Sequence, residues 1–462
     1  MIFPKAAAGM TKEEKREQML NEPVNKLIMK LAGPAVLSML VTSLYNMADT
    51  FFVSQLGTSA SGAVGVIFSL MAIFQAFAFM IGQGAGNNMS RAIGAGQMEL
   101  AEIYNSTGFF TELIVGAFFC LAGNIVMEDL VYWLGATDTI APYAMDYCRY
   151  VLFGTPFIMA SFGMNNLLRF QGYSSYAAVG IVTGGILNMI LDPIFIFAMD
   201  LGTAGAAIAT SLSQFISFLI LLYMCMFRKG CIRISLKKFR PTLKMYLNIV
   251  NTGLPSLARQ GIMSVSNIVF NHLAHPYGDA CIAAFSIVQK YTGLINSAAL
   301  GIGQGFQPVC GQNYGAKKYG RVNEAYRFLV KMQFAVLIVL SVISFIFAGP
   351  IVTAFRRDDP EVIRIGTALL KFQSLTLPLM SVIISSNMLS QTIGYGLKAT
   401  FVSCLRSGIC LVPLQFILPK FLGLTGLQLS QPVSDVLSSA VAVLVISGII
   451  NELKEKEKEA AL

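Results

Sequence analysis

Two aspartates stand inside stretches of sequence that are otherwise apolar enough to cross a membrane. Asp49 lies in SLYNMADTFF, and Asp192 lies in GGILNMILDPIF. An ionised carboxylate at the centre of a membrane helix costs roughly 2.5 to 3.5 kcal/mol, so each aspartate must pair, take up a proton or face water. Each also has a polar residue four positions earlier, Tyr45 and Asn188 respectively, which lies on the same helical face.

Both aspartates lie at similar distances from the start of their apolar stretches, so we expect them at matching depth. Thr210, in AAIATSLSQ, can add a hydroxyl oxygen. Carboxylate, amide and hydroxyl oxygens are hard ligands, which suit Na⁺ or a proton rather than zinc or copper. Two neighbouring carboxylates repel each other, so the pair would switch between a charged and a neutralised state. The pattern predicts a cation site, for Na⁺ or H⁺, at Asp49, Asn188, Asp192 and Thr210.

A local structural role is the alternative for each aspartate. Asp192-Pro193 has the form of a turn or helix-cap signal. An internal repeat of 221 residues argues against a purely structural role, because it places Asp49 on Phe270 and Asp192 on Pro413. If the carboxylates only supported the fold, both halves of the repeat would be expected to contain them. The asymmetry favours a coupling site in the first half alone.

That repeat is visible in several short matches. IGQGAG at 81–86 recurs as IGQGFQ at 302–307, and 302 − 81 = 221. The same shift places Pro34 on Pro255 and LGTAG at 201–205 on LGLTG at 422–426. If each half holds six spans, both halves start on the same side of the membrane. Such parallel repeats enclose a central cleft.

The composition is that of a membrane protein. The 462 residues are 55% hydrophobic and 12% charged, against about 25% charged in ordinary soluble proteins. A soluble fold of this length could not bury so much apolar surface. About twelve apolar runs are long enough to cross the membrane: 32–54, 60–86, 105–127, 148–170, 176–199, 205–227, 248–272, 280–306, 325–349, 362–391, 398–419 and 425–450. The predicted fold is an all-α polytopic membrane protein with two pseudo-symmetric six-helix lobes around a central cleft.

Loop charges predict the orientation. The net charge of +9 comes from basic residues in short loops such as RKGCIRISLKKFRPTLK, which is the positive-inside pattern of membrane proteins and not a nucleic-acid signal. Both termini are therefore assigned to the cytoplasm. The predicted segments are a cytoplasmic N-terminal segment (1–30), the N-lobe (31–227), a basic cytoplasmic linker (228–247), the C-lobe (248–450) and a charged cytoplasmic tail (451–462). Eight scattered cysteines without CxxC, and only two histidines, indicate neither disulfides nor zinc.

Several stretches of the sequence resemble the multidrug and toxic compound extrusion (MATE) family, in its bacterial branch with carboxylates in the first lobe. They include GPAVLSMLVTSLYNMADTFFVSQLG, IGQGAGNNMSRAIGAG, NMILDPIFIF and GQNYGA. The resemblance implies twelve helices around a V-shaped cleft, in the inner membrane of a bacterial cell, and drug efflux driven by Na⁺ or H⁺. It implies a cation site at Asp49, Asn188, Asp192 and Thr210, a substrate cavity at Tyr45 and Asn165, and a helix bend at Pro34.

We therefore expect a monomeric secondary antiporter, surrounded by membrane lipid, that exports amphipathic, often cationic organic compounds by alternating access. No organic cofactor is expected. The spans contain no HExxH motif and no convincing catalytic pairing of histidine with serine or cysteine, so they do not point to an enzyme. The alternative is a flippase for a lipid-linked precursor, which basic residues in the spans would favour: Arg259, Lys290 and Lys371. The roles of these three residues, and of Glu112 and Lys331, stay open.

Overall fold

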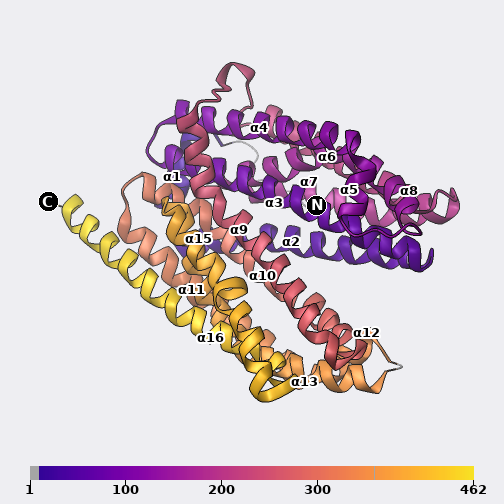
Figure 1. Ribbon diagram of the computed structural model, residues 1–462. Coiled ribbons are helices and arrows are strands. Elements are labelled where there is room, and N and C mark those ends of the chain that lie inside the picture. Colours follow the sequence, from indigo (N-terminus) through magenta and orange to yellow (C-terminus); the bar gives the residue numbers. More distant parts are fainter. Residues whose placement is uncertain (1–9, 358, 462) are drawn as a thin grey trace.

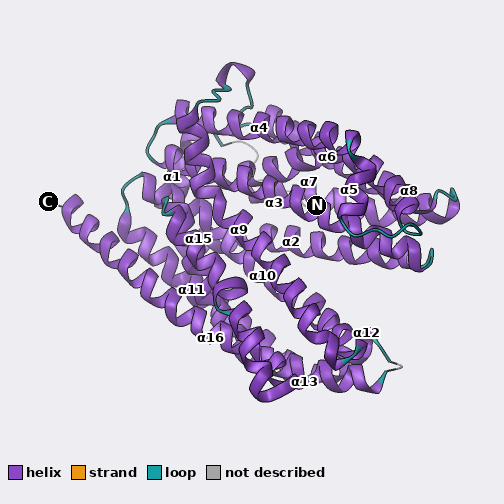
Figure 2. Ribbon diagram, viewed as in Figure 1, coloured by secondary structure: helices purple, strands orange, loops and turns teal. Residues whose placement is uncertain are grey.

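The protein is described from a computed structural model that covers residues 10–357 and 359–461. Within these residues every regular element is a helix, and short loops join them (Figure 2). The predicted all-α class is therefore confirmed.

The first lobe comprises the helices from α2 to α8. They are α2 (Val24–Ser54), α3 (Thr58–Gly94), α4 (Met98–Ile125), the short α5 (Met127–Trp133), α6 (Ala141–Phe170), α7 (Ser174–Pro193) with its π-helical extension η2 (Ile194–Ala198), and α8 (Gly202–Phe227). Helix α6 is central, since it packs against α3, α4, α7 and α8. The basic segment that follows holds only one 3₁₀ turn, η3 (Leu236–Lys238).

The second lobe comprises the helices from α9 to α16. They are α9 (Leu243–Ala274) with the 3₁₀ turn η4 (His275–Tyr277), α10 (Asp279–Gly315), α11 (Tyr319–Ile346), the short α12 (Ala348–Phe355), α13 (Pro360–Thr376), η5 (Leu377–Leu379), α14 (Met380–Ile393), α15 (Gly396–Cys404), the π-helical η6 (Leu405–Ile409) and α16 (Leu411–Ala461). Helix α10 packs against α11, α13 and α14, and α16 covers α13 and α14.

Nine helical segments of the described chain are long and apolar enough to span a membrane. The ninth of them joins two predicted spans, which separate at Gly423 because its φ of +57° is not helical. Two further predicted spans form the long helices α9 and α10, of 32 and 37 residues, which both line a central cleft. The twelve predicted spans are thus all present as helices.

The two lobes meet through equivalent helices. Helix α2 packs on α10, α9 packs on α3, and α3 packs on α10. A Cβ atom at Gly94 would lie 1.9 Å from the carbonyl oxygen of Gln312, and one at Gly315 would lie 2.0 Å from that of Arg91. Both pairs obey the repeat, since 315 − 94 = 221 and 312 − 91 = 221. Glycine is therefore required at both positions for the backbones to approach this closely.

We call the end of the molecule that carries α1 (Lys12–Asn21) and the last turns of α16 the terminal end. The start of α2 and the end of α16 lie close together there, because Asn25 and Glu457 line one surface pocket. In Figure 1 the two lobes meet on the side where α1 lies and diverge toward the side where α8 and α12 lie. The lobes are therefore packed together at the terminal end and separated at the other.

Helix α1 is more than the cytoplasmic lead-in that we expected. The Arg16 side chain donates to the carbonyl oxygens of Ile93 (2.9 Å) and Gly94 (2.8 Å), which end α3 in the first lobe. Lys12 forms an ion pair with Glu102 at 2.9 Å. The sequence did not reveal these contacts because α1 is charged and short.

The same helix also contacts the second lobe. The Asn313 amide donates to the carbonyl oxygen of Met19 (3.1 Å), and Lys318 donates to that of Leu20 (3.1 Å). The Met19 side chain is buried within the core of the second lobe. Helix α1 therefore bridges both lobes across the terminal end.

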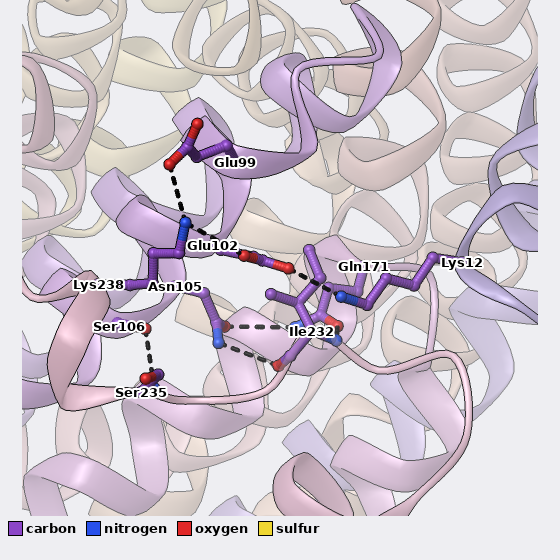
Figure 3. A network of polar contacts seen from close by, with 9 residues as sticks. All are labelled: Lys12, Glu99, Glu102, Asn105, Ser106, Gln171, Ile232, Ser235 and Lys238. Atoms are coloured by element: carbon purple, nitrogen blue, oxygen red, sulfur yellow. Dashed lines mark hydrogen bonds and ion pairs between the residues drawn. The ribbon is translucent and has the colours of Figure 1, made fainter.

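The basic linker is folded against the first lobe, as Figure 3 shows. Its backbone is held at Ile232, whose N–H donates to Gln171 (2.7 Å) and whose carbonyl oxygen accepts from Asn105 (3.1 Å). Lys238 forms an ion pair with Glu99 at 2.9 Å. Polar side chains at the ends of α4 and α6 thus fix the linker in place.

Candidate cation site and central cleft

Three of the four predicted site residues form one hydrogen-bonded group. The Asn188 amide on α7 donates to Asp192, one turn later, at 3.1 Å, and to the hydroxyl of Thr210 on α8, also at 3.1 Å. The spacing of four residues places Asn188 and Asp192 on one face of α7, as expected. Asp192 does not cap a helix, because its Oδ1 accepts from Asn188 within the last turn of α7.

Asp49 on α2 joins this group through a residue that the sequence did not reveal. The hydroxyl of Tyr147 on α6 donates to Asp49 Oδ2 at 3.3 Å, and Tyr147 is also hydrogen-bonded to Thr210. Asp49 and Asp192 lie close enough for their charges to interact. Four helices of the first lobe, α2, α6, α7 and α8, therefore contribute to one polar cluster. We call Asp49, Tyr147, Asn188, Asp192 and Thr210 the acidic cluster.

The acidic cluster is almost completely buried. Asp49 is 5% exposed, Thr210 4%, Asn188 1% and Asp192 0%. Asp49 Oδ1, Asn188 Oδ1 and Asp192 Oδ2 have no hydrogen-bond partner among the described residues. Unpaired buried oxygens are costly in a fold, and buried charges need a partner.

The arrangement can hold a monovalent cation or a proton. Two carboxylates provide negative charge, while the free oxygens of Asp49, Asn188 and Asp192 provide hard ligands. A bound cation, or a proton on one carboxyl group, would compensate the repulsion between the aspartates. No described basic side chain forms an ion pair with either of them.

The predicted substrate residues have different surroundings. Tyr45 lines a small cavity of about 70 Å³ together with Thr210 of the acidic cluster and Gln214. The amide of Asn165 donates to the carbonyl oxygen of Ala177 at 2.9 Å, and Asn165 is not among the described residues that line this cavity or the central cleft. A substrate contact thus remains a prediction for both.

Pro34 lies inside α2, whose helical backbone is continuous from Val24 to Ser54. Because proline lacks an N–H, it removes one hydrogen bond from the helix. The hydroxyl of Ser38, one turn later, donates to the Pro34 carbonyl oxygen at 3.0 Å. A change of bend at Pro34 between functional states remains a prediction.

A cleft of about 450 Å³ lies between the lobes. It shares Asn46, Phe68, Gln75 and Gln260 with the smaller cavity that Thr210 lines, so the cleft adjoins a cavity that one member of the acidic cluster borders. The lobes touch across the cleft through the hydroxyls of Ser43 and Ser297, which are 2.8 Å apart.

The five other intramembrane charges that the sequence analysis named divide into three groups. Arg259 and Lys290 line the cleft. Lys331 lines a pocket at the terminal end, and Lys371 lies over the ring of Phe345 at 5.7 Å, away from the cleft. Glu112 on α4 is completely buried, and neither of its carboxylate oxygens has a partner among the described residues.

Two repeated helical lobes around a polar cleft define a polytopic membrane transporter. The family model MatE matches residues 34–194 and 255–417, one segment in each lobe. The chain belongs to the MATE family, and the predicted family is confirmed.

Relatives and solved structures match along almost the whole chain. The multidrug export protein MepA of Staphylococcus saprophyticus is 24% identical over 436 residues, which are 94% of this chain and 96% of the relative. A crystal structure of MATE in complex with MaL6 is 27% identical with a TM-score of 0.91, and the match covers 95% of this chain and 99% of that one. An outward-facing MATE transporter of the MOP superfamily is 27% identical with a TM-score of 0.90, covering 95% and 98%.

Proposed function

We propose that this protein is a secondary antiporter that exports small amphipathic organic compounds in exchange for Na⁺ or H⁺ by alternating access. The acidic cluster is the coupling site, and the central cleft receives the compound. The observation that carries this proposal is the pair of buried carboxylates in the first lobe, each with one oxygen that has no partner among the described residues. Thr210 of the same cluster lines a cavity that adjoins the cleft. The named export function of the MepA relatives supports the same activity.

The proposed orientation places the terminal end in the cytoplasm of a bacterial cell. Positive charge in the linker and in α1 supports this assignment through the positive-inside rule. The cleft then opens outward, as in the outward-facing transporter that the chain resembles. A cation entering from outside would reach the acidic cluster and displace the compound from the cleft. We propose that one copy of the chain, surrounded by lipid, suffices for this cycle.

The test is transport by the purified protein in vesicles. Efflux of ethidium or of a fluoroquinolone, which carries a carboxylate, should follow an imposed Na⁺ gradient or an imposed pH gradient, and protein-free vesicles give the background rate. The two gradients are applied separately, so the experiment also identifies the coupling ion. If neither gradient drives efflux of any organic compound tested, the antiport proposal is wrong.

The second candidate function is a flippase for an anionic lipid-linked precursor. Two of the three basic residues that favour it, Arg259 and Lys290, line the cleft, whereas Lys371 lies outside it. The acidic cluster favours the antiporter, because a flippase does not need a buried carboxylate pair in one lobe. Transfer of a fluorescent phospholipid between leaflets, measured in the same vesicles, would distinguish the two.

A further inference from the structure

The charged side chains of the central cleft all belong to the second lobe. The first lobe contributes only uncharged residues from α2 and α3, such as Asn46 and Phe68. The second lobe contributes three basic residues and one acidic residue: Arg259, Lys290, Arg406 and Asp435. The cleft therefore carries an excess of positive charge, opposite in sign to the acidic cluster.

Arg406 is neutralised within the protein. Its Nε donates to Asp435 Oδ1 at 2.7 Å. Asp435 also accepts from Gln431 at 2.8 Å and from Thr376 at 3.0 Å, and it is almost completely buried. This carboxylate is thus already paired with Arg406.

Arg259 and Lys290 have no such partner. Neither forms an ion pair or a hydrogen bond with any residue in the described parts of the chain. Unpaired basic residues inside a membrane domain are costly unless they face water or bind an anion. Both side chains line the cleft, so both conditions can be met there.

The two basic residues lie at different depths. The amide of Gln289 on α10 donates to Asn267 on α9 at 3.0 Å, which sets these antiparallel helices in register. Lys290 is next to Gln289, while Arg259 lies eight residues before Asn267, toward the terminal end. At about 1.5 Å per helical residue, Arg259 is roughly 10 Å deeper than Lys290. An anionic group entering the cleft would meet Lys290 first and Arg259 further in.

The remaining walls suit an apolar body. Phe68 and Phe79 of α3 and Met263 of α9 line the same cleft. Met263 lies one turn from Arg259 on α9, so an apolar group and a charged group of one ligand could be bound side by side. Flat aromatic or flexible apolar groups would pack against such side chains.

We propose that the cleft binds amphipathic compounds through an acidic group, such as a carboxylate, held by Arg259 and Lys290. This inference rests on the proposed transport function and narrows its substrate class. Arginine and lysine both bind carboxylates by charge-assisted hydrogen bonds. Compounds that carry a carboxylate are therefore preferred over the corresponding esters, which lack that negative charge, even where the rest of the molecule is cationic. A membrane lipid with an anionic headgroup has the same chemistry.

The test uses two fluorescent dyes that differ only at this group. Rhodamine 19 carries a free carboxylate, and rhodamine 6G is its ethyl ester. Fluorescence polarisation measures the binding of each dye to the purified protein. We expect the acid to bind at least tenfold more tightly than the ester. In the double variant Arg259→Gln/Lys290→Gln the acid should lose this advantage, whereas the affinity for the ester should change less than twofold, which also shows that the variant is folded.

Lys371→Gln is the matched control, because it removes an intramembrane lysine outside the cleft. It should leave both affinities unchanged. Equal binding of acid and ester, or equal losses for both dyes in the double variant, would overturn the inference. Failure of the antiport proposal gives a different result: no dye moves under a gradient, although the acid still binds through Arg259 and Lys290.

Transport of a fluorescent phosphatidylglycerol, in the same vesicles, separates the two sources of the acidic group. Lipid transfer that depends on Arg259 and Lys290 assigns the group to a lipid. Efflux of rhodamine 19 with the same dependence assigns it to a free compound. If neither transfer nor dye binding depends on these residues, the inference is wrong.

Discussion

Tyr147 is the residue that joins the two halves of the acidic cluster. Its hydroxyl group bonds Asp49 on α2 and Thr210 on α8, while its ring belongs to the apolar core beside α3. A hydrogen bond donated to a carboxylate stabilises the charged form and fixes its orientation. Tyr147 therefore acts as a positioning residue for Asp49.

Replacing Tyr147 with phenylalanine should keep the ring and remove the hydrogen bond. We expect normal expression and an apparent affinity for the coupling ion that changes by about tenfold, because a hydrogen bond to a charged group is worth about 1.5 to 3 kcal/mol. The affinity should be weaker for Na⁺, since Asp49 loses its orientation, and tighter for H⁺, since the charged carboxylate loses a stabilising donor. The measurement is efflux rate against Na⁺ or H⁺ concentration. Tyr150→Phe, at an exposed tyrosine one turn away, is the control. An unchanged ion dependence in Tyr147→Phe would contradict this role.

Glu112 occupies a tight space between helices. A Cβ atom at Gly163 on α6 would lie 1.2 Å from Glu112 Oε2. Gly163→Ala should therefore destabilise the protein by about 1 to 3 kcal/mol through overpacking. Shortening the Glu112 side chain as well, in the double variant Gly163→Ala/Glu112→Ala, should restore part of that stability.

Thermal unfolding in detergent would measure both variants. Gly65→Ala is the control, because a Cβ atom there meets no atom within 4 Å. If Gly163→Ala unfolds at the same temperature as Gly65→Ala, the packing described for Glu112 is wrong.

At the scale of single elements, we expect the attachment of α1 to depend on pH. Burial, reinforced by the charge of Lys30, lowers the pKa of Lys15 to about 8 from an ordinary value of 10.5. When α1 detaches, Lys15 regains its ordinary pKa and binds a proton more readily. Attachment therefore strengthens as the pH rises from about 8 to 10.5, and below pH 8 it carries the full cost of a buried charge.

Lys15→Met should remove that cost and bind α1 more tightly at pH 7. Hydrogen exchange of residues 12–21 would be slower in the variant than in the parent protein, since exchange reports local opening. Glu17→Met, at an exposed position of the same helix, is the control for a general gain in hydrophobicity. Equal exchange in the Lys15→Met variant and the parent would show that the Lys15 charge does not limit attachment.

The elements differ in how well the sequence predicts them. The transmembrane helices followed from apolar runs, because the membrane requires about 20 apolar residues for each span. The pairing of Asn188 with Asp192 followed from helical spacing. Helix α1 was missed because it is mostly charged, and its stability comes from contacts with Ile93, Gly94 and Asn313, which lie far away in sequence.

Tyr147 was missed for a similar reason. Its hydroxyl group acts only through residues that are 98 and 63 positions away, since 147 − 49 = 98 and 210 − 147 = 63. The charge of the cleft was equally hidden, because Asp435 neutralises Arg406 and leaves Arg259 and Lys290 unpaired. Such pairings depend on tertiary structure, whereas single intramembrane charges can be recognised from the sequence.

At the scale of the whole molecule, the contact between the lobes at the terminal end depends on two equivalent glycines. Gly94→Ala would place a Cβ atom 1.9 Å from the backbone of Gln312 and so push the lobes apart. We expect faster hydrogen exchange at residues 91–97 and 312–318, because closure of this end becomes less favourable. Gly315→Ala should act in the same way because the contact is symmetric.

Gly261→Ala is the matched control for these variants, since no atom lies within 4 Å of a Cβ atom at this helical glycine. Exchange at the terminal end should then stay as in the parent protein. Unchanged exchange in both Gly94→Ala and Gly315→Ala would contradict the closure described for this end.

The central claim is that Asp49 and Asp192 act as one coupling site. The decisive measurement is gradient-driven efflux by Asp49→Asn, Asp192→Asn and the double variant, each reconstituted at equal amounts. Asparagine keeps the size and removes the charge, so folding should survive while efflux falls at least tenfold in each single variant. Because neighbouring groups that act together are strongly non-additive, the double variant should be little worse than either single one. Partial losses that multiply in the double variant would contradict the account.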